Sequence, residues 1–179
     1  VILTGASETA ALFRGFNPEL DINAETSGKN ALIVTPAADR DLAMADLVHS
    51  AFGHAGQKCS AASLGIMVGS VATSQRYEKQ LLDAASSMVV DWSPGIKDGV
   101  KPGSFFHLTE CFGPVLGLMH ADTLAEAMEL QNQVDFGLTA GIHSLDAAEV
   151  ATWLDTVQAG NLYVNRGITG AIVQRQPFG

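Results

Sequence analysis

Residues 56–63 of the chain read GQKCSAAS and place Cys59 in a turn between a segment with helical periodicity and an apolar run. Backbone N–H groups of such a turn, or the adjacent Lys58, favour the thiolate form of a cysteine. A thiolate is a strong nucleophile, so the segment predicts covalent catalysis by Cys59. For an isolated cysteine the competing interpretation is an inert, buried thiol in a tight turn. Two further segments favour the nucleophile.

The first of these segments, residues 25–30, reads ETSGKN and directly precedes the apolar run 31–34. This position predicts that Glu25 lies on a loop that enters a strand, from which its carboxylate can reach into a cleft. Beside a reacting cysteine, such a carboxylate can take a proton from the thiol or from a water that attacks an acyl intermediate. Considered alone, such a residue is more often a solvated loop carboxylate.

The second segment, residues 108–115, reads LTECFGPV, with an acid and an aromatic before a Gly-Pro turn. Glu110 can bind sugar hydroxyls there, and Phe112 can pack against a flat ring. The competing interpretation makes the aromatic residue part of the core. Cys111, between them, is expected to be small and buried and to have no role.

In this order the three segments resemble the signatures of the aldehyde dehydrogenase superfamily: a Glu-x-Gly/Ser-Gly-Lys loop, a Gly-Gln-x-Cys turn and a Glu-x-Phe-Gly-Pro turn. A fourth match is the strand 161–165, which ends in Asn165, the asparagine that the family carries near its active site. The resemblance covers nearly the whole chain. It implies an α/β fold with a parallel twisted sheet and crossover helices, the catalytic domain of that family.

The resemblance also implies roles for individual residues. Cys59 matches the nucleophile that attacks the aldehyde to give a thiohemiacetal, which loses hydride to NAD and becomes a thioester. Glu25 matches the general base for the hydrolytic water. Glu110 matches the residue that holds the nicotinamide ribose, and Phe112 the residue that packs beside the nicotinamide. The backbone N–H of Cys59 is expected to be one oxyanion donor.

The tail, residues 165–179, reads NRGITGAIVQRQPFG and resembles the glutamate-γ-semialdehyde (pyrroline-5-carboxylate) dehydrogenases, including the C-terminal module of bifunctional proline-utilization proteins. That resemblance implies that Gly170 and Ala171 donate backbone N–H groups to the α-carboxylate of the substrate. It also implies that Phe178 packs on the aliphatic part and that Ser60 adds a hydroxyl. Backbone N–H groups of a glycine turn suit a carboxylate on physical grounds. The alternative is a flexible, glycine-rich connection.

Strand-like and helix-like segments alternate along the chain, which independently predicts a parallel sheet with crossover helices. A strand at 1–4 leads through Gly5 into a helix that contains Ser7 and runs to about Arg14. A strand, a glycine turn and a helix N-terminus form an anion site, so Gly5 and Ser7 are predicted to bind the pyrophosphate of the cofactor. The family usually has serine directly after this Thr-Gly, whereas Ala6 stands there in this chain.

Further along the chain, a strand is predicted at 64–71, and Thr123 and Asp146 are predicted to cap helices. Gly160 is expected to end the last helix before the strand at 161. The sheet is then expected to bring Cys59, Glu110 and Asn165 together at loop ends, where open α/β sheets carry their sites.

The resemblance divides the chain into three parts. Residues 1–24 are the last strand and helix of a dinucleotide-binding domain, residues 25–165 the catalytic cysteine domain, and residues 166–179 the substrate-anchor loop. The chain is interpreted as a fragment without most of the cofactor fold and the second oxyanion donor, and is expected to be inactive alone. The segment 87–103 is shorter than the family has, so residues are expected to be missing near 89–92.

Composition excludes several classes of function. The chain has 179 residues, 47% of them apolar, and a formal net charge of −9, which gives no basic stripe for nucleic acid. No apolar run approaches the ~18 residues of a membrane span. The two cysteines form no disulfide framework and suggest a reducing, cytoplasmic location. The histidines show no metal-ligand spacing, so no metal is predicted.

The expected partners are a small aldehyde substrate, further copies of the full-length protein in a homo-oligomer, and a fused proline dehydrogenase module. Two alternative functions stay open. One is a dehydrogenase of another semialdehyde, such as succinate semialdehyde. The other is a non-catalytic assembly domain.

Overall fold

A computed structural model describes residues 1–88 and 94–170 of the chain. Its main body is a six-stranded sheet in the order β5-β6-β4-β3-β7-β8, and every neighbouring pair is parallel. The predicted α/β fold with a parallel sheet is therefore confirmed. The strands are Asn30–Val34 (β3), Ala62–Val68 (β4), Gly95–Lys97 (β5), Val115–Ala121 (β6), Thr139–His143 (β7) and Asn161–Val164 (β8).

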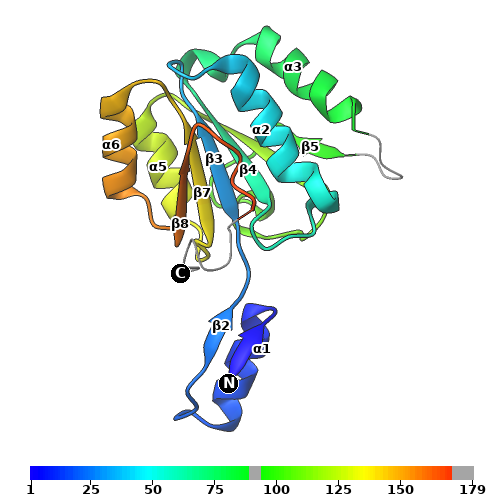
Figure 1. Ribbon diagram of the computed structural model, residues 1–179, viewed down its shortest axis with the longest axis vertical. Coiled ribbons are helices and arrows are strands. Elements are labelled where there is room, and N and C mark those ends of the chain that lie inside the picture. Colours follow the sequence, from blue (N-terminus) through cyan, green and yellow to red (C-terminus); the bar gives the residue numbers. More distant parts are fainter. Residues whose placement is uncertain (89–93, 171–179) are drawn as a thin grey trace.

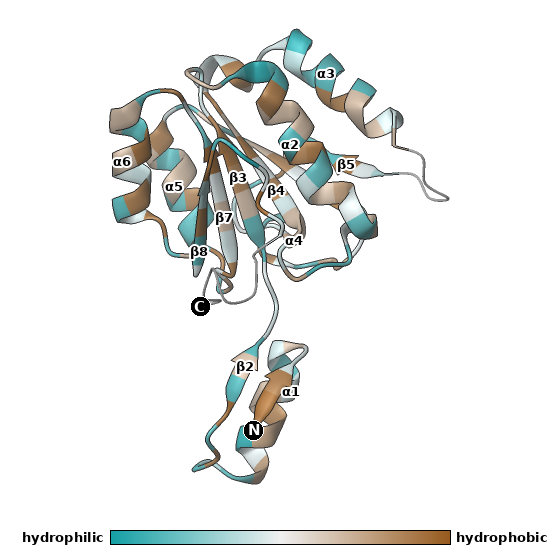
Figure 2. Cartoon of the chain, in the orientation of Figure 1, coloured by the Kyte–Doolittle hydropathy of each residue, from teal (hydrophilic) through white to brown (hydrophobic). Residues whose placement is uncertain are grey.

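Helices cover both faces of this sheet (Figure 1). One face is packed by Arg40–Phe52 (α2) and Gln75–Ser86 (α3), and the other by Leu124–Asn132 (α5) and Ala147–Thr156 (α6). Because successive side chains of a strand point to opposite faces, β3 contributes Leu32 and Val34 to one core and Ala31 and Ile33 to the other. All residues of β3, β4 and β7 are buried, as expected for a sheet covered twice. Figure 2 shows the hydrophobic colour along most of β3.

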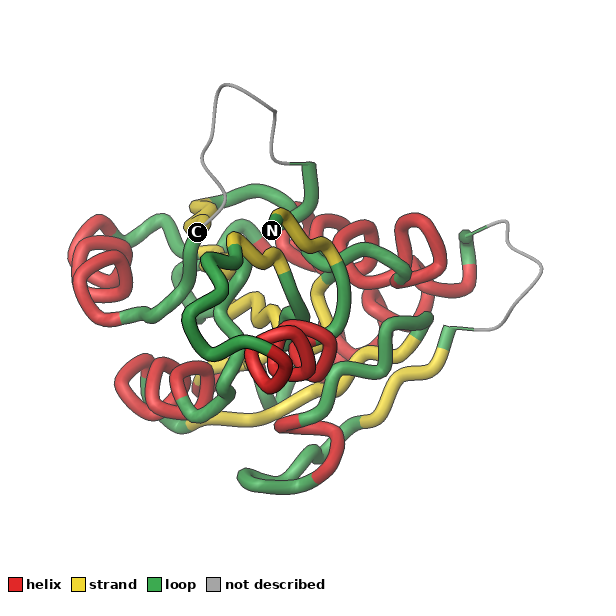
Figure 3. The backbone as a smooth tube through the Cα atoms, turned by 90° about the horizontal axis from the view of Figure 1, so that it is seen from below, coloured by secondary structure: helices red, strands yellow, loops and turns green. Residues whose placement is uncertain are grey.

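A small N-terminal unit lies at one end of this sheet (Figures 1 and 3). It consists of Ile2–Thr4 (β1), Ser7–Phe16 (α1) and Asn23–Glu25 (β2), with β1 and β2 parallel. Helix α1 buries none of its residues, and the side chain of Ile2 is 90% exposed. Two strands and one helix are too little for an independent core, so this unit needs further elements to cover its apolar side chains.

The helix caps were predicted well. The Thr123 hydroxyl accepts a hydrogen bond from the Glu126 N–H at 3.2 Å, and the Asp146 carboxylate accepts from the N–H groups of Ala148 and Glu149. Element ends were predicted less well. β4 ends at Val68 because Gly69, with φ +53°, starts a 3₁₀ turn over Gly69–Val71 (η2).

Three further boundaries differ from the prediction. Helix α1 runs to Phe16, whereas about Arg14 was expected. Helix α6 ends at Thr156, four residues before Gly160. Glu25 is the last residue of β2 and not part of a loop, because its segment pairs with β1.

Candidate active site

Two glycine-containing turns meet at the amino ends of the central strands. Cys59 lies just before β4, after the 3₁₀ turn Gly53–Gly56 (η1), and Glu110 lies just before β6, after the short helix Phe105–Leu108 (α4). Gly56 has φ +66°, and a Cβ added there would overlap the carbonyl oxygen of Gly113. Only glycine allows the two turns to approach this closely. The cysteine turn is thereby fixed against the turn that carries Glu110.

The loop after Glu25 is fitted to the cysteine turn in the same way. A Cβ on Gly28 would lie 2.5 Å from the carbonyl oxygen of Cys59. Next to it, the buried side chain of Asn30 donates hydrogen bonds to the carbonyl oxygens of Cys59 at 2.6 Å and Ala61 at 2.9 Å. The Asn30 Oδ1 accepts from the Thr139 N–H at 2.9 Å. Asn30 therefore ties the backbone of the nucleophile turn to β3 and β7.

Sequence analysis did not single out Asn30 as a functional residue. A usable signal was present, because an asparagine directly before an apolar strand is expected to be buried, and a buried amide needs hydrogen-bond partners.

A cavity of about 670 Å³ joins the N-terminal unit to these turns. Its lining includes seven of the predicted site residues, drawn from five separate segments: Cys59, Ser60, Glu25, Glu110, Phe112, Gly5 and Gly170. Ser7 does not line the cavity, and its buried Oγ has no hydrogen-bond partner among the residues that the structure describes. Ala171 and Phe178 lie outside the described residues.

Phe112 stands in an unusual backbone conformation at the cavity wall. Its φ is +46°, and its side chain is 53% exposed. A large residue in the left-handed region is strained, and such strain gathers at functional sites. Its neighbour Cys111, which was expected to be buried, is exposed. The prediction was wrong because the Gly-Pro turn leaves this backbone outside the core.

A buried lysine lies behind the cavity. Lys29 is 3% exposed, and its Nζ donates a hydrogen bond to the Ser63 carbonyl oxygen at 3.4 Å. Burial lowers the pKa of Lys29 to about 8, against the opposing effect of Cys111 and Glu110. Burial also raises the pKa of Glu110, and this rise is opposed by hydrogen bonds from the Gly28 backbone and the Ser27 side chain and by the charge of Lys29. Lys29 thus stabilises the anionic form of Glu110.

Asn165 does not join this site. Its side chain accepts from the Ser144 N–H at 2.9 Å and donates to the Ser144 carbonyl oxygen at 2.8 Å, just beyond the carboxyl end of β7. Cys59 and Glu110 precede their strands, whereas Asn165 follows β8, so a parallel sheet places them at opposite ends. The prediction that groups Asn165 with the nucleophile was wrong. Sites of parallel sheets usually lie at the carboxyl ends of the strands. The small sheet follows this pattern, because Glu25 ends β2 at the cavity.

Residues 165–170 lead from the carboxyl end of β8 back along α2 to the cavity. The Ile168 N–H donates to the Ser50 hydroxyl at 3.0 Å, and the Ile168 side chain is fully buried against Gly141. At the start of this loop, the buried His143 ring lies 3.3 Å from the Asp46 carboxylate. The loop then reaches Gly170, whose φ of +89° turns the backbone at the cavity wall.

Within residues 1–88 and 94–170, no helix is long and apolar enough to cross a membrane. No group of three or more histidine, cysteine or acidic side chains in the same ranges is placed to hold a metal ion.

Comparison with known proteins identifies the family of the chain. The model of the aldehyde dehydrogenase family matches residues 1–93 and 90–179. A 1-pyrroline-5-carboxylate dehydrogenase of Geobacillus sp. (strain WCH70) is 33% identical over 201 residues, covering 87% of this chain and 39% of its own length. The chain thus spans about two fifths of that relative. The alignment is longer than the chain itself, so the relative has residues without a counterpart here.

Solved structures agree with this fold. Proline Utilization A from Corynebacterium freiburgense has a TM-score of 0.93 and 54% identity, covering 99% of this chain and 23% of that protein. A 1-pyrroline-5-carboxylate dehydrogenase from Thermus with bound NAD has a TM-score of 0.90 and 28% identity, covering 99% and 45%. The family model covers nearly the whole chain, and the relatives and solved structures match most of it, so the chain belongs to the aldehyde dehydrogenase family.

Proposed function

We propose that the protein containing this chain oxidises L-glutamate γ-semialdehyde to L-glutamate, with NAD as the hydride acceptor. The observation that carries the proposal is the 670 Å³ cavity, where a cysteine, two carboxylates and a glycine turn meet from four separate segments. The names of the relatives, 1-pyrroline-5-carboxylate dehydrogenase and Proline Utilization A, support this choice of substrate.

In this proposal Cys59 attacks the aldehyde carbon as a thiolate, and the carbonyl oxygen becomes the oxyanion of a thiohemiacetal. The backbone N–H of Cys59 donates to that oxyanion. The carbon then gives up its hydride and becomes a thioester on Cys59. A water molecule, deprotonated by Glu25, attacks the thioester and releases the carboxylic acid and the thiolate. Asn30 keeps the turn in place during both steps, because it holds the Cys59 carbonyl oxygen.

The residues around the cavity fit a dinucleotide. NAD, when bound, supplies the acceptor for the hydride. Glu110, whose pKa burial raises against the hydrogen bonds of Gly28 and Ser27 and the charge of Lys29, would accept hydrogen bonds from the ribose hydroxyls, and the exposed ring of Phe112 would offer a flat surface to the nicotinamide. Gly5 follows β1 and Ser7 begins α1, so the N–H groups of that helix start can bind phosphate; the Ser7 hydroxyl there has no partner among the described residues.

The amino acid end of the substrate is assigned to the loop at Gly170. The backbone N–H groups of Gly170 and Ala171 bind the α-carboxylate, Ser60 adds a hydroxyl, and Phe178 packs on the aliphatic part. A semialdehyde without an α-amino acid end, such as succinate semialdehyde, uses fewer of these contacts. We therefore expect a higher kcat/KM for glutamate γ-semialdehyde.

The test is NADH formation by the full-length protein with each semialdehyde. Cys59→Ala is expected to abolish NADH formation, and the matched control Cys111→Ala is expected to keep it, because both thiols are replaced in the same way. Equal kcat/KM values for the two semialdehydes would contradict the proposal that glutamate γ-semialdehyde is the preferred substrate. Full NADH formation by Cys59→Ala would contradict a catalytic role for this domain and would support the alternative of an assembly domain.

The 179-residue chain alone is expected to form no NADH. Its N-terminal unit exposes Ile2 and Phe16. Few contacts therefore hold the start of α1, which is proposed to bind phosphate, in place. Turnover by the isolated chain that is lost in Cys59→Ala would contradict this expectation.

A further inference from the structure

The loop that leads to Gly170 is held against α2 at two neighbouring residues. The Ile168 N–H donates to the Ser50 hydroxyl at 3.0 Å. A Cβ added to Gly167 would lie 2.9 Å from that hydroxyl oxygen and 3.7 Å from Oδ1 of Asp46. The φ of Gly167 is not in the left-handed region, so glycine is needed here for close contact with the helix. Asp46 and Ser50 are four residues apart on α2 and therefore share one face of it.

A buried histidine meets the same face of α2. His143 is the last residue of β7, and its Nε2 lies 3.3 Å from Oδ2 of Asp46. The backbone of Arg166 also approaches the ring. Among the residues that the structure describes, neither ring nitrogen and not Oδ2 of Asp46 has a hydrogen bond of good geometry. Burial lowers the pKa of His143, against the opposing effects of Asp46, Asp39 and the Arg166 backbone, so the ring is neutral at pH 7.

This pair is poorly suited to stabilise the fold. The side chain of His143 is 0% exposed and that of Asp46 is 22% exposed. Buried polar atoms without hydrogen bonds cost free energy, and a buried ion pair seldom regains what the loss of water costs. The place of the pair indicates another role, because one oxygen of the Asp46 carboxylate faces His143 and the other faces Gly167.

The contact at Gly167 is close to the cavity along the chain. Gly170 lines the cavity together with Cys59 and follows Gly167 by three residues. Extended chain spans about 3.3 Å per residue, so three residues offer little slack. A displacement of Gly167 on α2 is therefore passed on to Gly170.

We propose that His143 and Asp46 are positioning residues for this loop, and that they set how closely Gly170 approaches the α-carboxylate of the substrate. The inference rests on the proposed function, which assigns that carboxylate to the loop. Neither His143 nor Asp46 lines the cavity, so both act on the substrate only through the backbone of the loop.

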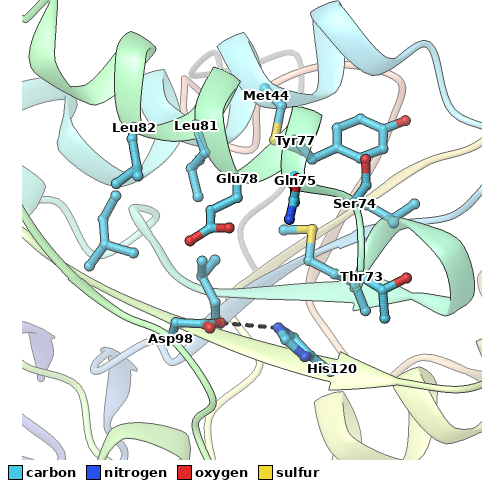
Figure 4. A pocket seen from close by; sticks show the side chains of 15 residues that line it. Met44, Thr73, Ser74, Gln75, Tyr77, Glu78, Leu81, Leu82, Asp98 and His120 are labelled. Carbon is cyan, nitrogen blue, oxygen red and sulfur yellow. Dashed lines mark hydrogen bonds and ion pairs between the residues drawn. The ribbon is translucent and has the colours of Figure 1, made fainter.

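The sheet carries a second pair of the same chemistry, which serves as the control (Figure 4). His120 of β6 lies 3.0 Å from Asp98, and their side chains are 45% and 65% exposed. Neither residue lines the cavity of the nucleophile. The two pairs therefore allow the same substitutions to be compared beside the loop and away from it.

The experiment compares Asp46→Asn and His143→Gln with Asp98→Asn and His120→Gln in the full-length protein. The kinetic constants are measured for glutamate γ-semialdehyde and for butanal, an aldehyde of similar length without a carboxylate. Asp46→Asn and His143→Gln are each expected to raise KM for the semialdehyde about tenfold, as when a hydrogen bond to a charged group loses its alignment. The value of kcat for the semialdehyde and both constants for butanal are expected to stay near those of the wild type. The control variants are expected to change neither substrate.

Hydrogen exchange of the Ile168 and Gly170 amides reports the loop without turnover. It is expected to be faster in Asp46→Asn and His143→Gln and unchanged in the control variants. A wild-type protein that oxidises neither aldehyde would refute the proposed function, and the exchange rates alone would then decide whether the pair positions the loop. The double variant Asp46→Asn/His143→Gln is expected to resemble each single variant, because both residues act through one contact.

Three results would overturn the inference. The first is a KM for the semialdehyde that neither Asp46→Asn nor His143→Gln raises. The second is an equal change in the constants of both aldehydes together with a lower thermal midpoint, because the pair would then only stabilise the fold. The third is exchange of the Gly170 amide that matches the wild type in both variants.

Discussion

The two ends of the six-stranded sheet are built by different means. At the amino ends, backbone packs directly on backbone at Gly56 and Gly28, and the buried Asn30 side chain holds the same turn. At the carboxyl ends, polar side chains connect the loops, as Asn165 does with Ser144. The comparison shows that the end carrying the nucleophile depends on exact backbone contacts. At the opposite end a side-chain hydrogen bond joins the loops, so we expect that end to tolerate small changes better.

The strongest test of this difference is Gly56→Ala. The new Cβ would overlap the Gly113 carbonyl oxygen, and φ +66° adds strain, so we expect a loss of about 4–5 kcal/mol in the free energy of unfolding. The control is Gly99→Ala, where φ is +63° but nothing lies within 4 Å of the added Cβ. It should cost only about 1–2 kcal/mol. Urea denaturation measures both, and equal losses would show that close approach of the turns does not matter.

Asn30→Leu should have the next largest effect. The substitution leaves the carbonyl oxygens of Cys59 and Ala61 and the Thr139 N–H without their buried partner, at an expected cost of about 3–4 kcal/mol. The control Asn132→Leu removes side-chain hydrogen bonds of the same kind to Thr156 and Gln158 in exposed positions. Its expected cost is below about 1 kcal/mol. Similar denaturation midpoints for the two variants would contradict the role assigned to Asn30.

Lys29 should give the amino end a specific pH dependence. Its pKa falls from 10.5 to about 8 on folding, so between these values the unfolded chain binds a proton that the folded chain has lost. The contribution of Lys29 to the free energy of unfolding therefore rises by about 3 kcal/mol as the pH rises from about 8 to 10.5. In Lys29→Met the rise should be absent, whereas the exposed Lys101→Met should keep it. The measurement is urea denaturation at pH 8 and 10, and parallel pH curves for wild type and Lys29→Met would disprove it.

The smallest effect is expected from Ser50→Ala, on the loop that connects the two ends. Its hydroxyl holds the Ile168 N–H at 3.0 Å, and its loss should cost about 1 kcal/mol and speed exchange of the Ile168 amide. Ser86→Ala, which removes a solvent-exposed hydrogen bond to the Leu82 carbonyl oxygen, serves as the control. No change in Ile168 exchange would mean that packing of its buried side chain holds the loop alone.

Local sequence signals predicted the parallel sheet, the capped helices and the separate turns of Cys59 and Glu110. They failed for Asn165. In a parallel sheet, the end at which a residue lies depends on whether the residue precedes or follows its strand. They also failed for Glu25, whose strand exists only through its pairing with β1. Both errors concern long-range pairing, which no local pattern of residues encodes.

The length of the segment from Glu25 to Asn30 sets the distance between the proposed base and the turn that carries the nucleophile. Glu25 is fixed in the small sheet and Asn30 in the large one, and Gly28 is fixed against the Cys59 carbonyl oxygen between them. One residue of extended chain spans about 3.3 Å, roughly the length of a hydrogen bond. A single-residue insertion at Thr26 would therefore leave both sheets intact and still move the proposed base out of step with the nucleophile. In this stretch an insertion is more harmful than most substitutions, and the spacing of residues 25–30 carries as much functional information as their identity.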